Sequence, residues 1–413
     1  MTNNILINFK NPSFFSLVLF ILFLPNFEAP KNIFFLFFVL AWIFEAIKSR
    51  SWGGKWLTID TIFASWIIID IIVAINAVYI HGQPYKGSFD IARFVIFGWI
   101  ISRQNFNVKE LHKLVIYSVL SVLPIFILFF TGCDSGGQCL KLNSVGHVNH
   151  TAIFLLLTLA LGFSYLFFEK NNLFPKIKYM LFFVILMAIT FVAILTESRA
   201  ASAMVIFLFL YFSSISLYAK FKYAKIIIIL TLTIAITVFS FEKPKVIDRF
   251  INEEINLIGD SVSGRGPIRN FAYEVFKIDP ILGTGMSNFP NFNLQDIKNQ
   301  VIKEKGSDWW INNKDKFSPY EHPHNVYLVY LSGGGVIFFS LFILFWLYIS
   351  YLLIRESYLK GLDWTKSAAF LAIIINLSIG YVNTTFAHEH ALISMLIIGI
   401  FLSKYRKSSL LKS

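Results

Sequence analysis

The sequence predicts an all-α polytopic membrane protein with about twelve transmembrane helices and one long outer loop that carries short helices. Three observations support this fold class. Of the 413 residues, 56% are hydrophobic and 15% are charged, whereas about a quarter of the residues of a soluble protein are charged. Apolar runs long enough to cross a bilayer recur along the chain. Basic residues also collect in every second connection between these runs.

We expect membrane spans near residues 12–27, 31–47, 60–80, 88–102, 110–131, 149–168, 178–195, 199–218, 224–241, 325–354, 366–382 and 387–403. With the N-terminus inside, the Lys- and Arg-rich connections all face the cytoplasm, as the positive-inside rule requires. Both termini are then cytoplasmic. Residues 1–241 form the first nine spans, residues 242–324 form the outer loop, and residues 325–413 form the last three spans.

The net charge and the cysteines fit the same topology. A charge of +12 would favour nucleic-acid binding by a soluble protein, but here it follows from basic inner loops, so we expect no nucleic-acid partner. Cys133 and Cys139 lie in an outer loop, where an oxidising compartment permits a disulfide between them. Two free thiols are the alternative.

The polar stretch 261–335 is the part of the chain where chemistry is expected. Gly264-Arg265-Gly266-Pro267 is a helix start, and apolar residues at helical spacing continue it to Ile278. Arg265 and Arg269 can share one face of this helix near its N-terminus, which is a suitable site for an anion such as phosphate. Alternatively, the arginines pair with nearby acidic residues, namely Glu253, Glu254 or Asp260.

A second group follows at His322-Pro323-His324-Asn325. Pro323 favours extended backbone at His322, and Asn325 is expected to cap the next helix. The glycines at 333–335 indicate a kink or close packing within that helix. His324 then lies near the outer surface, where a neutral imidazole can act as a base; a plain pair of interfacial histidines is the alternative.

Three further features bear on the site. Arg199 starts the eighth span at the outer face, where it either snorkels to the surface or faces a polar cavity. The first outer loop, 26–31, contains a single acidic residue, Glu28, rather than an acidic pair that would hold a metal ion. A zinc site would need His388, Glu389 and His390, and we do not expect one.

Taken together, these motifs resemble the O-antigen ligase family. The resemblance is carried by Ser198-Arg199-Ala200, Gly264-Arg265, the turn Pro280–Phe289 with sequence PILGTGMSNF, and His322–Asn325 before a glycine-rich helix. It covers about residues 148–350 by motif and the whole chain by topology. O-antigen polymerases and bacterial protein O-glycosyltransferases resemble the chain in the same way.

The resemblance implies a metal-independent glycosyltransferase of the GT-C type that needs no cofactor and acts in lipopolysaccharide biosynthesis. It implies an inner-membrane protein that takes a glycan from undecaprenyl diphosphate at the periplasmic face and joins it to the lipid A core. Arg199 and Arg265 match the family's essential arginines, and His324 matches its essential histidine. Their neighbours Gly264, Arg269, His322 and Asn325 are expected to contact the substrate.

Two alternatives lie outside ligation. A polymerase or a protein O-glycosyltransferase would perform the same chemistry on another acceptor. A transporter of lipid-linked glycan would favour ionisable pairs at mid-membrane depth, and Asp70 with Arg93 is one such predicted pair.

Overall fold

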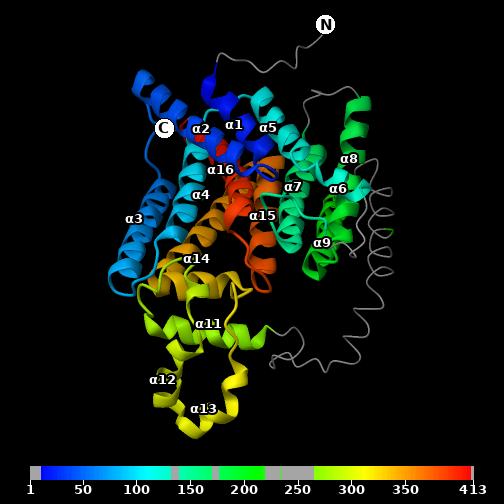
Figure 1. Cartoon of the computed structure of the whole chain (residues 1–413). Coiled ribbons are helices and arrows are strands. Elements are labelled where there is room, and N and C mark those ends of the chain that lie inside the picture. The colour runs from blue at the N-terminus through cyan, green and yellow to red at the C-terminus, as the bar shows by residue number, and fades with distance from the viewer. Residues whose placement is uncertain (1–10, 132–138, 170–175, 219–232, 234–264, 411–413) are drawn as a thin grey trace.

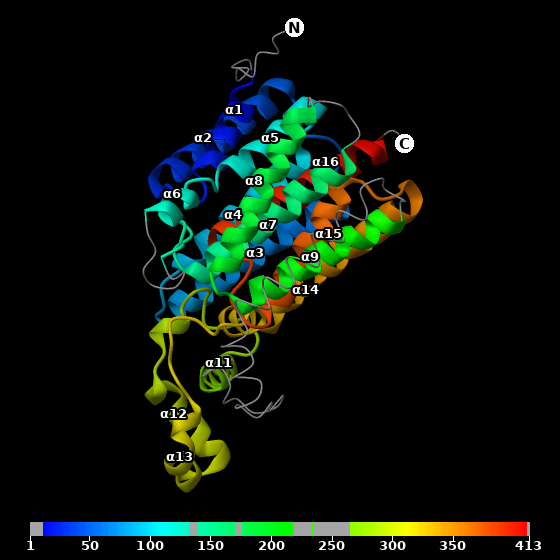
Figure 2. The same ribbon diagram turned by 90° about the vertical axis from the view of Figure 1, so that its right-hand side faces the viewer.

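The structure, a computed structural model, describes residues 11–131, 139–169, 176–218, 233 and 265–410, and this part of the chain is helical without strands. A bundle of long helices carries a small helical lobe at one end (Figure 1). Turning the molecule shows that the lobe projects from the bundle, with α1 toward the opposite end (Figure 2).

The bundle helices begin and end close to the predicted spans. They are α1 (Pro12–Phe23), α2 (Glu28–Ser49), α3 (Thr58–Tyr79), α4 (Lys86–Arg103), α5 (Val108–Leu120), α6 (Ile125–Phe130), α7 (Val148–Phe168), α8 (Lys176–Leu195), α9 (Arg199–Tyr218), α14 (Val326–Lys360), α15 (Trp364–Gly380) and α16 (His388–Leu410). The predicted span at 110–131 is divided into α5 and α6. The predicted span at 224–241 lies outside the described residues.

Seven helical segments of the described residues are long and apolar enough to cross a membrane, one of them formed by α5 and α6 together, and α1 and α15 are shorter apolar helices. These features agree with a polytopic membrane protein, while the full count of twelve spans stays a prediction. The helices α2 and α3 expose many large apolar side chains, including Leu36, Phe44 and Ile68. Such surfaces suit contact with lipid rather than water.

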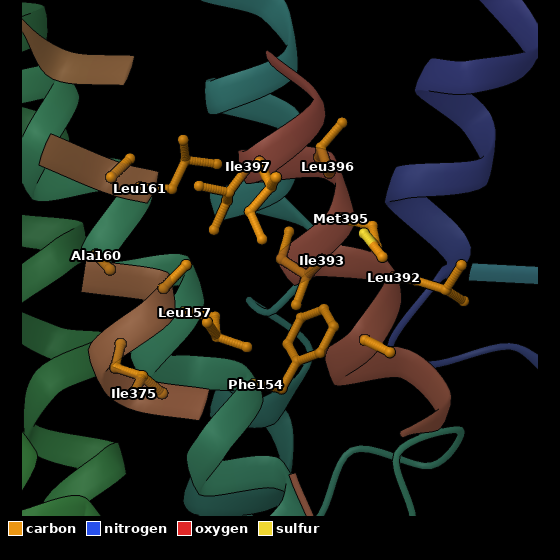
Figure 3. Close-up of a cluster of buried hydrophobic side chains, with 14 of the residues drawn as sticks. Phe154, Leu157, Ala160, Leu161, Ile375, Leu392, Ile393, Met395, Leu396 and Ile397 are labelled. Carbon is orange, nitrogen blue, oxygen red and sulfur yellow. The ribbon is translucent and has the colours of Figure 1, made fainter. Parts of the chain in front are cut away.

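The centre of the bundle is α7, since almost every side chain from Val148 to Tyr165 is buried. Figure 3 shows how Phe154, Leu157 and Leu161 of this helix face Ile393 and Ile397 of α16. Each of these side chains is at most 1% exposed. Because α7 has no lipid-facing side, it fixes the positions of the helices around it.

The connections that were predicted to face the cytoplasm meet at the end of the bundle that is remote from the lobe. Asp60 is fully buried and accepts two hydrogen bonds from Arg406, of 2.8 and 2.9 Å, and one from Arg103, of 3.0 Å. The hydroxyl of Ser403 donates to the backbone oxygen of Gln104. This buried carboxylate joins α3, α4 and α16, and its negative charge is tolerated there because two guanidinium groups pair with it.

The connections that were predicted to lie on the outer side of the membrane meet at the opposite end of the bundle, next to the lobe. Buried Lys31 contacts Glu389 at the start of α16 and donates to the hydroxyl of Ser144 at 2.6 Å. At the end of α3, Asn76 and His81 contact Asp279 of the lobe at 2.8 and 3.1 Å. The described segments therefore sort to two ends in the order that the alternating topology predicted.

The lobe consists of α11 (Gly266–Ile278), η1 (Phe289–Asn291), α12 (Leu294–Lys305), α13 (Ser307–Asn313) and η2 (Lys314–Lys316). It has its own small core, which is separate from the bundle core and includes Phe271, Phe289, Ile297, Trp310 and Phe317. The helix predicted from Pro267 to Ile278 is thus confirmed. Its apolar face packs into this core.

The glycine-rich part of α14 is both a kink and a site of close packing. Its backbone leaves helical geometry at Gly335, with φ 62° and ψ −172°. The turn after α11 fills the break: Val336 N–H donates to Pro280 O at 2.9 Å, and Gly285 N–H donates to Gly333 O at 2.8 Å. Backbone groups that the kink frees from the helix are therefore satisfied by the turn, and two motifs far apart in the sequence form one unit.

We predict that Gly335→Ala destabilises the protein more than Gly361→Ala. Both glycines have φ and ψ values that are almost confined to glycine, so each substitution costs about 1–3 kcal/mol. Only at Gly335 would a Cβ atom also lie 2.2 Å from the backbone oxygen of Ile281, whereas the space around Gly361 is open. Thermal unfolding of the purified protein in detergent should show the larger loss for Gly335→Ala. Equal losses would mean that the turn does not pack into the kink.

Candidate functional site

The site begins at the N-terminus of α14, where Asn325 is the N-cap residue. Its side-chain oxygen accepts a hydrogen bond from Leu328 N–H at 3.0 Å, which confirms the predicted cap. Its amide nitrogen donates to the backbone oxygen of Tyr381 at 3.1 Å. Asn325 therefore joins the start of α14 to the connection between α15 and α16.

His324 has an unusual backbone, with φ 51°, in the left-handed region that few residues other than glycine adopt. Its ring lies 4.1 Å from the ring of His322 and 5.3 Å from that of Tyr320, measured between centroids. The Nδ1 atom of His324 is buried and has no hydrogen-bond partner in the described part of the chain. Backbone strain and an unused buried nitrogen are features that functional sites often show.

Arg265 and Arg269 lie beside this group, held by the same connection. Arg265, at the N-cap position of α11, donates from Nη1 to the backbone oxygen of Val382. Arg269 donates from Nη2 to the backbone oxygen of Tyr381 at 2.9 Å and stacks over the Tyr381 ring. The acidic residues that the alternative reading would pair with these arginines, 253, 254 and 260, lie outside the described residues.

The connection from Tyr381 to Ala387 is the feature that sequence reasoning missed. Tyr381 and Val382 accept hydrogen bonds from the two arginines through their backbone oxygens, and the next residue, Asn383, is buried. Both hydrogen bonds use backbone oxygens, which leave no side-chain signature in the sequence. The polar run Asn383-Thr384-Thr385 between two apolar spans is the one signal that could have pointed to it.

Burial and neighbouring positive charge both lower the pKa values of the two imidazoles. Burial is the main cause that lowers the pKa of His324 to about 4, and the nearby His322 and Arg265 contribute to this decrease. Burial also lowers the pKa of His322. Both imidazoles are therefore neutral near pH 7, which is the form that can accept a proton.

Burial lowers the pKa of Arg265 as well, and the adjacent Arg269 lowers it further. A guanidinium group nevertheless stays protonated in proteins. Two positive charges held close together in a half-buried position repel each other, and an anion between them would relieve that repulsion. The pair is thus suited to bind a group with several negative charges, such as a diphosphate.

A second group of histidines adjoins the site from the bundle. His390 Nδ1 accepts from Ala387 N–H at 3.4 Å, and its Nε2 lies 3.0 Å from His150 Nδ1. The ring of His150 lies 6.0 Å from the ring of His322 and 6.1 Å from that of His147. No sequence motif connects His150 with the site, because it lies in the first turn of a buried helix.

The predicted zinc-ligand candidates each have a different partner. His388 lies 3.4 Å from Asp90, Glu389 pairs with Lys31, and His390 contacts His150. In the described residues, no group of three or more His, Cys, Asp or Glu side chains is arranged to hold a metal ion.

The remaining predicted residues are placed as follows. Arg199 is the first residue of α9 and is exposed, and no hydrogen bond or ring contact joins it to Arg265 or His324 in the described residues. Gly264 lies outside the described residues. Cys139 is disulfide-bonded, whereas Cys133 lies outside them.

The predicted pair between Asp70 and Arg93 is wrong. Arg93 contacts Asp90 at 3.1 Å and Asn32 at 3.0 Å. Asp70 is buried, and one of its carboxylate oxygens has no hydrogen-bond partner in the described residues. The sequence placed the two charges in neighbouring helices but could not define the faces on which they lie.

The fold and the site together define a polytopic membrane protein with a paired-arginine and histidine centre at one end of its bundle. A comparison with protein families finds that the O-antigen ligase model matches residues 182–343. This match confirms the predicted resemblance and supports a place in the superfamily of O-antigen ligases and polymerases. The match also suggests that the protein is a glycosyltransferase-like enzyme. The matched region contains Arg199, Arg265 and His324, whereas the connection from Tyr381 to Ala387 lies beyond it. No curated protein matches the chain.

We predict that Asn325→Ala destabilises the protein more than Asn325→Ser. Alanine removes the helix cap, which costs about 0.5–2 kcal/mol, and also removes the contact with Tyr381 O. Serine retains a capping oxygen and loses the contact with Tyr381 O. Apparent melting temperatures in detergent should rank wild type highest, then the serine variant, then the alanine variant. An alanine variant as stable as wild type would contradict the role of the cap.

Proposed function

We propose that this protein is a metal-independent, inverting glycosyltransferase that joins a glycan from undecaprenyl diphosphate to the lipid A core. The observation that carries the proposal is that one connection holds both groups in place. Val382 O accepts from Arg265, and the adjacent Tyr381 O accepts from Asn325, the residue that follows His324. A leaving group that accumulates negative charge and a hydroxyl that loses a proton need these two residue types side by side.

The reaction proceeds as a displacement at the anomeric carbon of the donor glycan. The acceptor hydroxyl oxygen forms a bond to this carbon as the bond from the carbon to the phosphate oxygen breaks. The bonding electrons leave with undecaprenyl diphosphate, and the hydroxyl proton passes to the imidazole of His324. Attack from the face opposite the leaving group inverts the anomeric configuration.

Arg265 contributes at the leaving group. Among the described residues it makes one hydrogen bond, to Val382 O, so most of its five N–H donors remain for phosphate oxygens. Arg269 has a buried Nε atom without a partner there, which is a second donor in the same region. Fixed positive charge stabilises the transition state more than the ground state because the diphosphate gains charge as the bond breaks.

Arg199 enters the proposal on the family resemblance alone, as a further contact to the diphosphate. Gly264, His322 and Asn325 are proposed to shape the substrate site around Arg265 and His324. Residues 242–324 are proposed to face the periplasm with this site, and the protein is proposed to lie in the inner membrane with both termini in the cytoplasm.

The polymerase remains the alternative within the same superfamily, because it differs only in the acceptor. The transporter hypothesis was supported by one predicted ionisable pair, and this pair does not form, since Arg93 contacts Asp90 rather than Asp70. Acceptor choice is therefore the question that separates the remaining candidates.

We predict that purified protein in detergent transfers labelled glycan from undecaprenyl diphosphate to lipid A core, also in the presence of a metal chelator. Arg265→Ala and His324→Ala should each lower the transfer rate at least about 100-fold, because each removes one charge or proton contact from the transition state. Lys314→Ala is the matched control, since Lys314 is an exposed basic residue of the lobe.

Transfer to lipid A core by the two variants at the wild-type rate would overturn the proposed roles. Elongation of a second lipid-linked glycan, without transfer to lipid A core, would identify a polymerase instead. Absence of both reactions in the wild-type protein, with accumulation of glycan on the carrier lipid in a strain that lacks it, would reject the substrates as proposed.

We predict that the transfer rate is nearly constant from about pH 8 to pH 5 and declines as the pH approaches 4. The pKa of His324 is about 4, so its imidazole stays an available proton acceptor above that value and is blocked below it. The dependence of kcat/KM on pH, measured with stopped assays, tests this. An acid limb centred near 6.5, the usual histidine value, would show that His324 is not buried as described or is not the base.

A further inference from the structure

Tyr320 places an exposed aromatic ring beside the two imidazoles of the candidate site. Its ring lies 5.3 Å from the ring of His324 and 6.0 Å from that of His322, with the planes inclined by 36° and 61°. Tyr320 is nevertheless 49% exposed. One part of the ring therefore packs against the imidazoles, while the rest is open to a ligand that approaches them.

The two hydrophobic cores do not account for this ring. Tyr320 belongs neither to the bundle core nor to the lobe core. Phe317, three residues earlier, is buried in the lobe core, so the chain leaves that core before it reaches Tyr320. The hydroxyl of Tyr320 makes no hydrogen bond within the described part of the chain. The ring contacts that Tyr320 makes there are both with imidazoles of the site.

Tyr320 also lies on a definite side of the site. Arg269 donates to Tyr381 O and stacks over the Tyr381 ring, with 5.1 Å between the guanidinium carbon and the ring centroid. Asn325, which follows His324, donates to the same oxygen. The arginine and the imidazole group therefore converge on one backbone oxygen. Tyr320 adjoins the imidazole group, and in the described residues no hydrogen bond or ring contact joins it to Arg269.

A sugar ring is a ligand that suits such a surface. Its C–H groups form apolar faces, and its hydroxyl groups project from its edge. The face of an aromatic ring carries partial negative charge, which attracts polarised C–H groups, and the contact also removes apolar area from water. Binding sites commonly combine such apolar surface with a few polar groups that fix the orientation of the ligand. Tyr320 supplies the apolar surface, and the imidazoles beside it supply the polar groups.

We propose that Tyr320 forms the binding subsite for the acceptor sugar, which packs one apolar face on the open part of the Tyr320 ring and thereby brings its reactive hydroxyl beside His322 and His324. This inference rests on the proposed function. The acceptor is the substrate that loses a proton, so it must approach the imidazoles, whereas the donor is held through its diphosphate by the arginines. Tyr320 thus binds and orients the acceptor and takes no part in bond breaking.

The kinetic experiment compares Tyr320→Leu and Tyr320→Phe with wild type, while the acceptor and the lipid-linked donor are varied separately. Tyr320→Leu removes the aromatic face, so the KM for lipid A core should rise about tenfold while kcat and the donor KM change less than about twofold. Tyr320→Phe keeps the ring and loses a hydroxyl that water solvates equally well, so its acceptor KM should stay within about twofold of wild type.

Tyr273→Leu is the matched control. Tyr273 is 50% exposed, and its ring lies 6.0 Å from that of Phe276 on the same helix, α11. This variant removes an equally exposed tyrosine ring from the lobe and should keep the wild-type kinetic constants. An unchanged acceptor KM in Tyr320→Leu would overturn the proposal. A fall in kcat without a change in the acceptor KM would do so as well, because the ring would then only support the imidazoles.

A second measurement does not depend on turnover. Core oligosaccharide released from lipid A is titrated onto the full chain in lipid nanodiscs without donor. Wild type and Tyr320→Phe should bind it with similar affinity, and Tyr320→Leu about tenfold more weakly. If Tyr320→Leu does not fold, Tyr320→Gln takes its place, because it also lacks the ring.

The two measurements separate the subsite from the reaction. If wild type binds the oligosaccharide but transfers no glycan to lipid A core, the proposed function fails, and the affinity of Tyr320→Leu relative to wild type still decides the role of Tyr320. If wild type does not bind the oligosaccharide, or if Tyr320→Leu binds it as tightly as wild type, the acceptor subsite is rejected even where transfer is observed.

Discussion

The site depends on one short connection that holds three side chains at once. Tyr381 O accepts from Arg269 and Asn325, and Val382 O accepts from Arg265. Backbone oxygens between two packed helices move little, so they fix the arginines relative to Asn325, the residue that follows His324. Such preorganisation lets charge stabilisation act in the transition state without a cost of rearrangement.

The arginines reach this connection because the lobe is fixed to the bundle at a second place. The turn between Pro280 and Gly285 occupies the kink of α14 at Gly335, and Asp279 contacts the end of α3. The lobe therefore cannot swing away from the bundle without exposing backbone groups that the kink has freed. The lobe supplies the arginines, the start of α14 supplies the imidazole, and the α15–α16 connection holds them together.

Much of the fold followed from composition and periodicity, because length and apolar content alone define a membrane span. The motif residues Arg265, Arg269, His324 and Asn325 were also brought together as expected. The α15–α16 connection was missed because its contacts use backbone oxygens, which any residue provides. The Asp70 and Arg93 pair was wrong because helix rotation, which sequence does not define, decides which charges meet.

The most direct test of this account is an experimental structure of the protein with undecaprenyl diphosphate bound. Phosphate oxygens should then lie within hydrogen-bond distance of the Arg265 guanidinium, next to His324. A diphosphate bound elsewhere, with Arg265 and Arg269 still directed only at the oxygens of Val382 and Tyr381, would contradict it.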